Sequence, residues 1–498
     1  MAFKNPLSER IWQCKYCYYL DDEQCDKNIE ETWIRLATAI AQVEEKEQNL
    51  WQKKFYSLLE NFKFLPGGRI IAGAGIEKDV TLMNCFVMGK LEDSIDGIFE
   101  GLKEGAKTMQ QGGGVGYDFS TLRPRGSIAE HAGTIASGPV SFMKVWDAMC
   151  ATMLSTGIRR GAMMACLRCD HPDIEEFISA KAKQNELTHF NVSVLVTDQF
   201  LAAVKADESW QLKFPLNGKV YKTVKARELW QKIMSESFTY SEPGVLFIDR
   251  INRMNNLWYC EEISATNPCG EVPLPAYGAC NLGSFNLTQF VRHPFSKQAS
   301  FDFSEFEKCI SIAVLFLDNV LDVTRFPLPK QKEKALSSRR LGLGITGLAS
   351  AFSLMGFRYG DERSIELTGK ILKALCWEAY NSRIELAREK GIFSDFNAEK
   401  FLQSGFAEFL PEDLRRRVSQ FGLRNSHLIA VAPTGTISLL ADNISSGIEP
   451  IFAFSYRRDV RLDVGSVESF QVRDYALQLY EQLHPGKELP NHFVSAQD

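Results

Sequence analysis

The stretch Asn-Pro-Cys-Gly-Glu-Val-Pro-Leu-Pro-Ala-Tyr-Gly-Ala-Cys-Asn-Leu-Gly occupies residues 267–283 and contains two cysteines, Cys269 and Cys280. A proline and a glycine flank Cys269, which predicts a tight turn or loop tip rather than the interior of a strand. A cysteine between the amide of Asn267 and the carboxylate of Glu271 can act as a nucleophile, a metal ligand or a radical carrier. Glu271 could serve as its base, whereas no Cys or His stands at metal-binding spacing beside it. A buried cysteine in an ordinary turn is the alternative.

A second motif, Pro-Thr-Gly-Thr-Ile-Ser at 433–438, follows an apolar run at 427–432 that we expect to form a short buried strand. Backbone N–H groups of a glycine-containing loop between a strand and a helix can bind an anion, and three hydroxyls add donors. The motif lacks the Gly-Lys-Ser/Thr of a Walker loop. An ordinary turn with capping hydroxyls is the alternative.

Two further loops are rich in glycine. Residues 112–116, Gly-Gly-Gly-Val-Gly, follow an expected helix that Ser94 caps. A dinucleotide-binding loop follows a strand instead, so we expect these glycines to allow close backbone approach inside a core. In the loop at 155–162, Arg159 and Arg160 stand between glycines and could contact phosphate or a base, with a solvated basic loop as the alternative.

The remaining cysteines suggest other possibilities. Cys14 and Cys17 form one Cys-x-x-Cys pair and Cys166 and Cys169 another, but the pairs are too far apart in sequence to resemble a zinc ribbon, and a four-cysteine zinc site is the less favoured alternative. Cys85 stands in an apolar run, where the default is a buried thiol.

Periodicity places these motifs on a largely parallel α/β fold. Residues 1–66 are predicted to be helical, with a helix from about Trp51 to Phe64, and 67–498 to form one α/β unit. Valines alternate along a strand at 191–197. Long amphipathic helices are expected at 306–322 and 364–390, and strands alternating with helices favour a parallel sheet.

Composition narrows the class of protein. The chain has 498 residues, 45% of them hydrophobic and 24% charged, with a net charge of −5. These values are typical of a globular protein and argue against non-specific binding to nucleic acid or to a membrane. No apolar run reaches the roughly 18 residues of a membrane span, and residues 1–13 lack the apolar segment of a signal peptide, so we expect a cytoplasmic protein. Its twelve cysteines are then not expected to form structural disulfides.

Taken together, these motifs and their order resemble the catalytic chain of ribonucleotide reductase. The residues of the motifs are most similar to those of the adenosylcobalamin-dependent class II enzymes. The resemblance covers about residue 66 to the end. Supporting runs include Ala136–Phe142, His171–Ile174, Arg339–Gly344 and Ser445–Pro450. The resemblance implies a ten-stranded α/β barrel with a central finger loop, preceded by a small helical N-terminal region.

The resemblance also implies roles for the motif residues. Cys269 would be the transient thiyl radical that abstracts the ribose 3′ hydrogen, held rigidly and away from water. Glu271 would be the general base and Asn267 would hydrogen-bond the ribose hydroxyls. Cys85 and Cys280 would supply the reducing equivalents and end as a disulfide. The substrate phosphates would be held by Thr434, Gly435, Thr436 and Ile437.

Regulation and partners follow from the same resemblance. A deoxynucleotide effector site is implied at Asp93, Ser94 and Ile95, with the loop of Arg159 and Arg160 connecting effector to substrate base. Effector sites of this family usually lie at a dimer interface, which allows a homodimer. The expected partners are therefore a ribonucleotide, a deoxynucleotide effector and a reductant, either thioredoxin-like or a C-terminal cysteine pair.

Two departures from the family pattern qualify these expectations. The last residues suggest that the final barrel elements and the cysteine-pair tail are missing, so we expect a truncated product or a split enzyme whose second short chain covers the open edge. No short motif marks a cobalamin pocket, so that cofactor rests on family wording alone. A class I large chain with a separate metal-radical subunit, or a non-catalytic nucleotide-binding subunit, remains the alternative.

Overall fold

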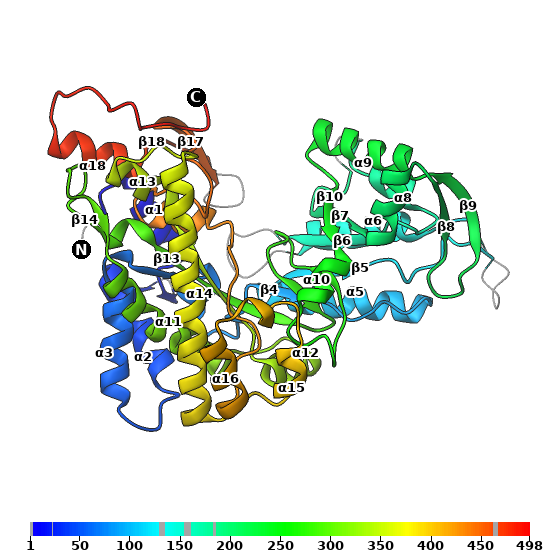
Figure 1. The fold of residues 1–498 in the computed structure, drawn as a ribbon, viewed down its shortest axis with the longest axis horizontal. Helices are drawn as coiled ribbons and strands as arrows, with labels where there is room; N and C mark the ends of the chain where they lie inside the picture. The colour runs from blue at the N-terminus through cyan, green and yellow to red at the C-terminus, as the bar shows by residue number, and fades with distance from the viewer. Residues whose placement is uncertain (1–2, 22, 129–134, 154–160, 183–185, 462–466) are drawn as a thin grey trace.

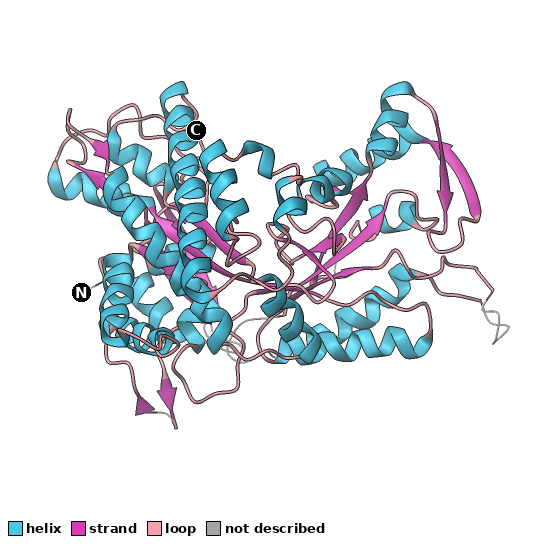
Figure 2. Cartoon of the chain, turned by 60° about the horizontal axis from the view of Figure 1, so that its bottom comes forward, coloured by secondary structure: helices cyan, strands magenta, loops and turns pink. Residues whose placement is uncertain are grey.

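A mixed sheet runs through the middle of the molecule in the computed structural model, which describes all residues except 1–2, 22, 129–134, 154–160, 183–185 and 462–466. Helices lie on both sides of the strands (Figure 2). In the described residues the sheet has eight strands, in the spatial order β10 (Gly244–Phe247), β7 (Phe190–Val196), β6 (Met163–Arg168), β5 (Gly114–Asp118), β4 (Cys85–Val87), β13 (Ala279–Asn286) and β16 (Leu341–Thr346), with β3 (Phe64–Pro66) also beside β13.

Two parallel groups of strands meet at one antiparallel junction. Strands β10, β7, β6, β5 and β4 are parallel to their neighbours, and β13 is parallel to β16. Strand β4 pairs antiparallel with β13, and in that register Cys85 lies opposite Cys280. The expected α/β class with a largely parallel sheet is confirmed, and the junction joins two segments far apart in sequence.

The N-terminal helices pack against the β13 side of the sheet. They are α1 (Pro6–Lys15), α2 (Ile29–Ala41) and α3 (Gln48–Leu59). The prediction that the third helix continues to Phe64 is wrong: it ends at Leu59, and Asn61 and Phe62 have positive φ values that a helix cannot contain. Residues 64–66 are strand β3, so the expected all-helical region contributes to the sheet at its end.

The two halves of the sheet, around β13 and around β5 to β10, carry different helices (Figure 1). Helices α11 (Phe303–Val323) and α14 (Glu362–Lys390) pack together near α2 and α3, and α5 (Ile95–Gln110), α6 (Pro139–Thr152), α8 (Asp198–Ala206) and α9 (Ala226–Tyr240) surround β5–β10. The predicted strand at 191–197 and the predicted helices at 306–322 and 364–390 are confirmed within a few residues. Other helices are α4 (Gly68–Gly73), α7 (Ile174–Ile178), α10 (Ile248–Met254), α12 (Pro329–Ser338), α13 (Leu348–Met355), α15 (Ala398–Leu402), α16 (Glu412–Phe421), α17 (Gly435–Leu440) and α18 (Tyr475–Leu483).

Five two-stranded hairpins are separate from the eight-stranded sheet among the described residues. They are β1 (Tyr19–Leu20) with β2 (Glu23–Gln24), β8 (Ser209–Lys213) with β9 (Val220–Lys225), β11 (Ile263–Thr266) with β12 (Pro273–Pro275), β14 (Val291–Arg292) with β15 (Ser300–Phe301), and β17 (Ser455–Arg461) with β18 (Val467–Arg473). The predicted strand at 427–432 runs beside β16 but forms only one bridge, between Ile429 and Leu343. Leu428, Ala430 and Ala432 are buried and Ile429 is exposed, so the expected short buried strand is only partly formed. No helix in the described part of the chain is long and apolar enough to cross a bilayer.

Candidate active site

The predicted loop tip around Cys269 is the turn of the hairpin β11–β12. The hairpin lies against strands β4, β5 and β6. Gly270 has a φ of +84°, in the left-handed region that glycine adopts without strain. The turn is closed by a hydrogen bond from the Val272 N–H to the Asn267 side-chain oxygen, at 2.9 Å. The expected finger loop is therefore a hairpin on the sheet whose turn carries the cysteine.

Glycines of strand β5 let this hairpin approach the sheet. A Cβ atom added at Gly116 would lie 1.8 Å from the backbone oxygen of Thr266, and one added at Gly114 would lie 3.0 Å from the ring of Pro268. Real Cβ contacts do not occur at the first distance. The close backbone approach predicted for residues 112–116 is thus seen between β5 and the hairpin.

Five predicted catalytic residues converge at this hairpin. Cys85 and Cys280 are directly opposite each other on β4 and β13. The Asn267 amide nitrogen donates to the Cys85 sulfur at 3.1 Å and to a Glu271 carboxylate oxygen at 2.6 Å. The Cys85 thiol in turn lies 3.9 Å from the other Glu271 oxygen. Cys269 acts electrostatically on Cys85, so it belongs to the same cluster.

Burial keeps the two paired cysteines in their thiol form. Cys85 and Cys280 are 4% and 1% exposed. Burial, reinforced by the Glu271 carboxylate, raises the pKa of Cys85 well above its ordinary value and that of Cys280 to about 12. Both groups therefore carry a hydrogen at neutral pH.

The position of Cys269 differs from one expectation. It was expected to be held away from water, but it is exposed. The reason is geometric: the preceding residues Asn267 and Pro268 are buried against the sheet, while the turn itself points outward from that contact. The hairpin thus places this cysteine at an exposed turn.

The predicted phosphate loop lies at the start of helix α17. Gly435 and Thr436 are at least partly exposed, and nothing lies within 4 Å of a Cβ added at Gly435. The Thr434 hydroxyl accepts from the Gly447 N–H at 2.8 Å and is 2.7 Å from the Thr346 hydroxyl. Thr434 thus braces the loop, and Ile437 is buried beneath it.

A cavity of about 340 Å³ borders this loop. Gly435, Ser438 and Ser446 line it together with Arg458. The Ser438 hydroxyl is already within 3.0 Å of the Ser446 hydroxyl and donates to the Gly435 carbonyl at 3.2 Å. The Gly435 N–H also donates already, to the Pro433 carbonyl, so the donors left for an anion at the start of α17 are the N–H groups of Thr436 and Ile437, rather than all three hydroxyls that the sequence suggested.

The predicted effector residues stand at the beginning of α5. The Ser94 hydroxyl accepts from the Gly97 N–H at 3.0 Å, which confirms the predicted cap. Asp93 is held by Arg123, whose Nε donates to it at 2.8 Å, and Ile95 is 63% exposed. Arg159 and Arg160 lie outside the described residues.

The other two cysteine pairs belong to elements in opposite halves of the molecule, α1 and β6 (Figure 1). Cys14 is in helix α1, whereas Cys166 is in strand β6. Among the residues that the structure describes, no group of three or more His, Cys, Asp or Glu side chains could hold a metal ion.

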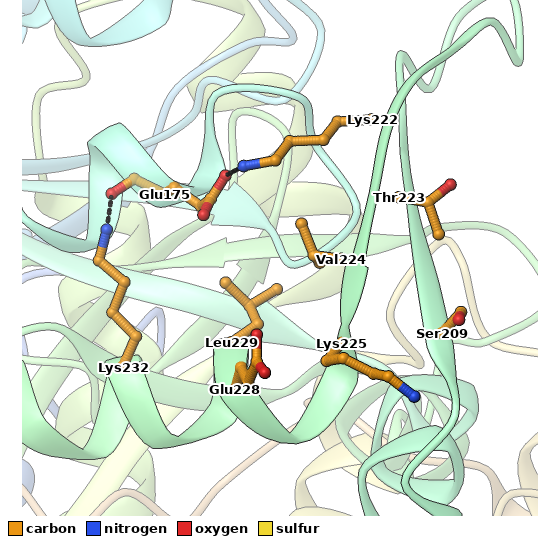
Figure 3. A pocket seen from close by; sticks show the side chains of 9 residues that line it. All are labelled: Glu175, Ser209, Lys222, Thr223, Val224, Lys225, Glu228, Leu229 and Lys232. Carbon is orange, nitrogen blue, oxygen red and sulfur yellow. Dashed lines mark hydrogen bonds and ion pairs between the residues drawn. The ribbon is translucent and has the colours of Figure 1, made fainter.

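A larger cavity, of about 540 Å³, lies on the lobe of α7, β8, β9 and α9 and includes none of the predicted site residues. Figure 3 shows Lys222 and Lys232 both turned toward Glu175, one to its carboxylate and one to its backbone oxygen at 2.9 Å. Both lysines thus hold the wall of the cavity together.

Some contacts of the site carried no local signal in the sequence. Arg123 is thirty residues from Asp93, and Thr346 is 88 residues from Thr434. Only the fold brings such pairs together. Arg340 and Glu261, which pair next to the cysteines, are a third example.

Comparisons with known proteins agree with this geometry. Residues 83–485 match the family model described as ribonucleotide reductase, barrel domain, and residues 2–79 match the model described as ribonucleotide reductase, all-alpha domain. Both matches fall on the parts of the chain described above.

Named relatives cover most of the chain. A vitamin B12-dependent ribonucleoside-diphosphate reductase of Mycobacterium tuberculosis is 38% identical over 89% of the chain and 62% of its own length. One of Thermoplasma acidophilum is 34% identical over 92% of the chain and 56% of its own length. A ribonucleoside-diphosphate reductase subunit alpha of Chlamydia pneumoniae is 25% identical over 84% and 45%. The chain thus spans about 60% of the length of the relatives that it resembles most among these.

Proposed function

This chain belongs to the ribonucleotide reductase family, and we propose that it reduces ribonucleotides, with diphosphates as the substrate class, to 2′-deoxyribonucleotides. The observation that carries the proposal is the cluster of Cys85, Cys280, Asn267 and Glu271 at the hairpin turn that presents Cys269. Such deoxynucleotides would serve DNA synthesis and repair.

In the proposed reaction, the Cys269 sulfur takes the 3′ hydrogen from the ribose and later returns it. Glu271 accepts the proton of the 3′ hydroxyl, and Asn267 keeps that carboxylate in place through its 2.6 Å hydrogen bond. The 2′ hydroxyl leaves as water after receiving a proton. Two electrons come from Cys85 and Cys280, whose sulfurs become a disulfide as the carbon is reduced.

The proposed cofactor is adenosylcobalamin, because the names of two relatives specify vitamin B12. When bound, it supplies the first radical. The exposed Cys269 fits this cofactor, since a bulky group can approach a sulfur at a loop tip more readily than one inside a core.

The substrate phosphates are proposed to bind at the start of α17. Thr436 and Ile437 would offer backbone N–H groups there, Gly435 would let the phosphates approach the backbone closely, and Thr434 would hold the loop through its two hydroxyl contacts. Several further expectations stay predictions. They are the effector site at Asp93, Ser94 and Ile95, the role of Arg159 and Arg160, the dithiol reductant, the homodimer, the second short chain and the domain boundary near residue 66.

The test is deoxynucleotide formation from a ribonucleoside diphosphate with adenosylcobalamin, an effector and a small dithiol. Cys269→Ser is expected to lower the rate at least about 1000-fold. The O–H bond of serine is much stronger than the S–H bond of cysteine, so serine would not form the radical that takes the 3′ hydrogen. Cys25→Ser changes an exposed cysteine of the β2 region and serves as the control that keeps the rate. Turnover by the Cys269→Ser chain would refute the proposal.

A further inference from the structure

Arg340 stands beside Cys280 on the neighbouring strand. Asn281 of β13 pairs with Leu341 of β16, so the register places the preceding residues, Cys280 and Arg340, next to each other. A Cβ added at Gly342 would lie 3.0 Å from the Cys280 sulfur, which shows that Cys280 points to the face that Gly342 shares. Side chains two residues apart in a strand point to the same face, and Arg340 is two residues before Gly342.

The Arg340 guanidinium is buried, and only one of its two terminal nitrogens has a partner among the described residues. It is 2% exposed, and one terminal nitrogen pairs with the Glu261 carboxylate at the base of the hairpin. Lys334 reaches the same carboxylate at 3.1 Å. The other terminal nitrogen, Nη1, has no hydrogen-bond partner among the described residues. A buried guanidinium N–H without a partner is costly, and it offers a place for an anion.

The charges around the two cysteines are unequal. Near Cys280, the Arg340 guanidinium favours a thiolate and the Glu271 carboxylate of the hairpin disfavours it. Glu271, Cys280 and Cys269 all disfavour a thiolate on Cys85, and the group that favours it is the neutral amide of Asn267, which donates to the sulfur at 3.1 Å. A thiolate is therefore better stabilised on Cys280 than on Cys85.

We propose that Arg340 is a positioning residue that makes Cys280 the leaving group when the Cys85–Cys280 disulfide is re-reduced. This inference rests on the proposed function, which forms that disulfide. A thiolate of an external dithiol attacks the Cys85 sulfur, the bond between the two cysteines breaks, and its electron pair goes to Cys280 as a thiolate beside Arg340. The second thiol of the reductant, as a thiolate, then attacks the mixed disulfide. Cys85 is released, the reductant becomes a disulfide, and both cysteines take protons from water.

The first test maps the mixed disulfide and needs no nucleotide turnover. The whole chain is oxidised, treated briefly with glutathione, quenched in acid and digested for mass spectrometry. We expect glutathione on Cys85. Predominant attachment to Cys280 would overturn the proposal, whether or not the chain forms deoxynucleotides. The result therefore separates this inference from the proposed function.

The second test removes the charge while keeping the balance of the buried pair. In Arg340→Gln with Glu261→Gln, re-reduction by dithiothreitol should slow about three-fold for each unit by which the Cys280 pKa rises. The profile of iodoacetamide alkylation of Cys280 against pH should shift to higher pH, and Arg340→Lys should restore both. An unchanged profile in the double variant would overturn the proposal. If that variant does not fold, the wild-type profiles decide: Cys280 must react at lower pH than Cys85, and the reverse order would refute it.

Discussion

Asn267 uses its whole amide to organise the site. Its nitrogen donates to Cys85 and to Glu271, and its oxygen accepts from the Val272 N–H. With both N–H bonds engaged in this way, the amide fixes the acid relative to the thiol before any substrate arrives. A residue expected to bind ribose hydroxyls therefore also has a role within the protein, and a bound sugar would have to share or replace these contacts.

His171 offers a test at the scale of one residue. Its ring is buried, Nδ1 accepts from the Asp173 N–H at 3.1 Å, and Nε2 donates to the Leu122 oxygen at 2.9 Å. Burial lowers the pKa of this histidine from 6.5 to about 4. The unfolded chain thus takes up a proton near pH 6.5 and the folded chain only near pH 4. The stabilising effect is complete above pH 6.5 and is lost as the pH falls toward 4.

Urea unfolding at several pH values measures this effect. Between pH 6.5 and 4 the wild type is expected to lose about 3 kcal/mol more unfolding free energy than His171→Gln. His293→Gln, at an exposed position, should behave as the wild type does. Equal losses in the wild type and in His171→Gln would contradict the assignment of a neutral, buried ring.

Individual residues differ in how far sequence could place them. The proline and glycine around Cys269 predicted its turn, because their backbone preferences act locally. The contacts of Arg123 with Asp93 and of Arg340 with Glu261 were not predicted, since each joins residues distant in sequence. The exposure of Cys269 depends on what surrounds the loop, which no local pattern records.

At the scale of elements, the close packing of the hairpin on strand β5 depends on glycines, which have no side chain to hold the two apart. Gly116→Ala would place a carbon 1.8 Å from the Thr266 oxygen, so the hairpin must move away from the sheet. We expect the unfolding free energy to fall by about 1–3 kcal/mol, as for overpacked cores. Deoxynucleotide formation should fall much further, because Cys269 moves with the hairpin.

The matched control is Gly369→Ala on the exposed side of α14. Nothing lies within 4 Å of its added Cβ, and alanine favours a helix over glycine by about 1 kcal/mol. This variant should be slightly more stable and fully active. If Gly116→Ala were equally harmless in melting and activity assays, the close approach of the hairpin would not be important for function.

Element boundaries were predictable where a cap marks them. Ser94 before α5 and Gly391 after α14 are such signals, and both elements begin or end at them. The end of α3 was missed because positive φ values at Asn61 and Phe62 occur without a glycine or proline. Strand β3 was missed because three residues are too few to show an alternating pattern.

At the scale of the whole molecule, the junction of β4 and β13 ties together the two parallel groups of strands. The pairing of Cys85 with Cys280 at this junction could not be read from spacing, because strand order is decided by the folded sheet. The family resemblance, rather than any local pattern, implied that these two sulfurs meet.

Oxidation of that pair is expected to stabilise the whole molecule. A Cys85–Cys280 disulfide would close a loop from residue 85 to residue 280 in the unfolded chain, which by loop-closure entropy raises the unfolding free energy by up to about 5 kcal/mol. Urea unfolding of the oxidised and the dithiothreitol-treated chain measures the difference. In Cys280→Ser the same oxidation should change nothing, whereas Cys376→Ser, in helix α14, should keep the effect. Equal stability of the oxidised and reduced wild type, with the disulfide verified by mass spectrometry, would contradict this expectation. Strain in the folded sheet would then offset the entropic gain, and the disulfide would be easy to reduce.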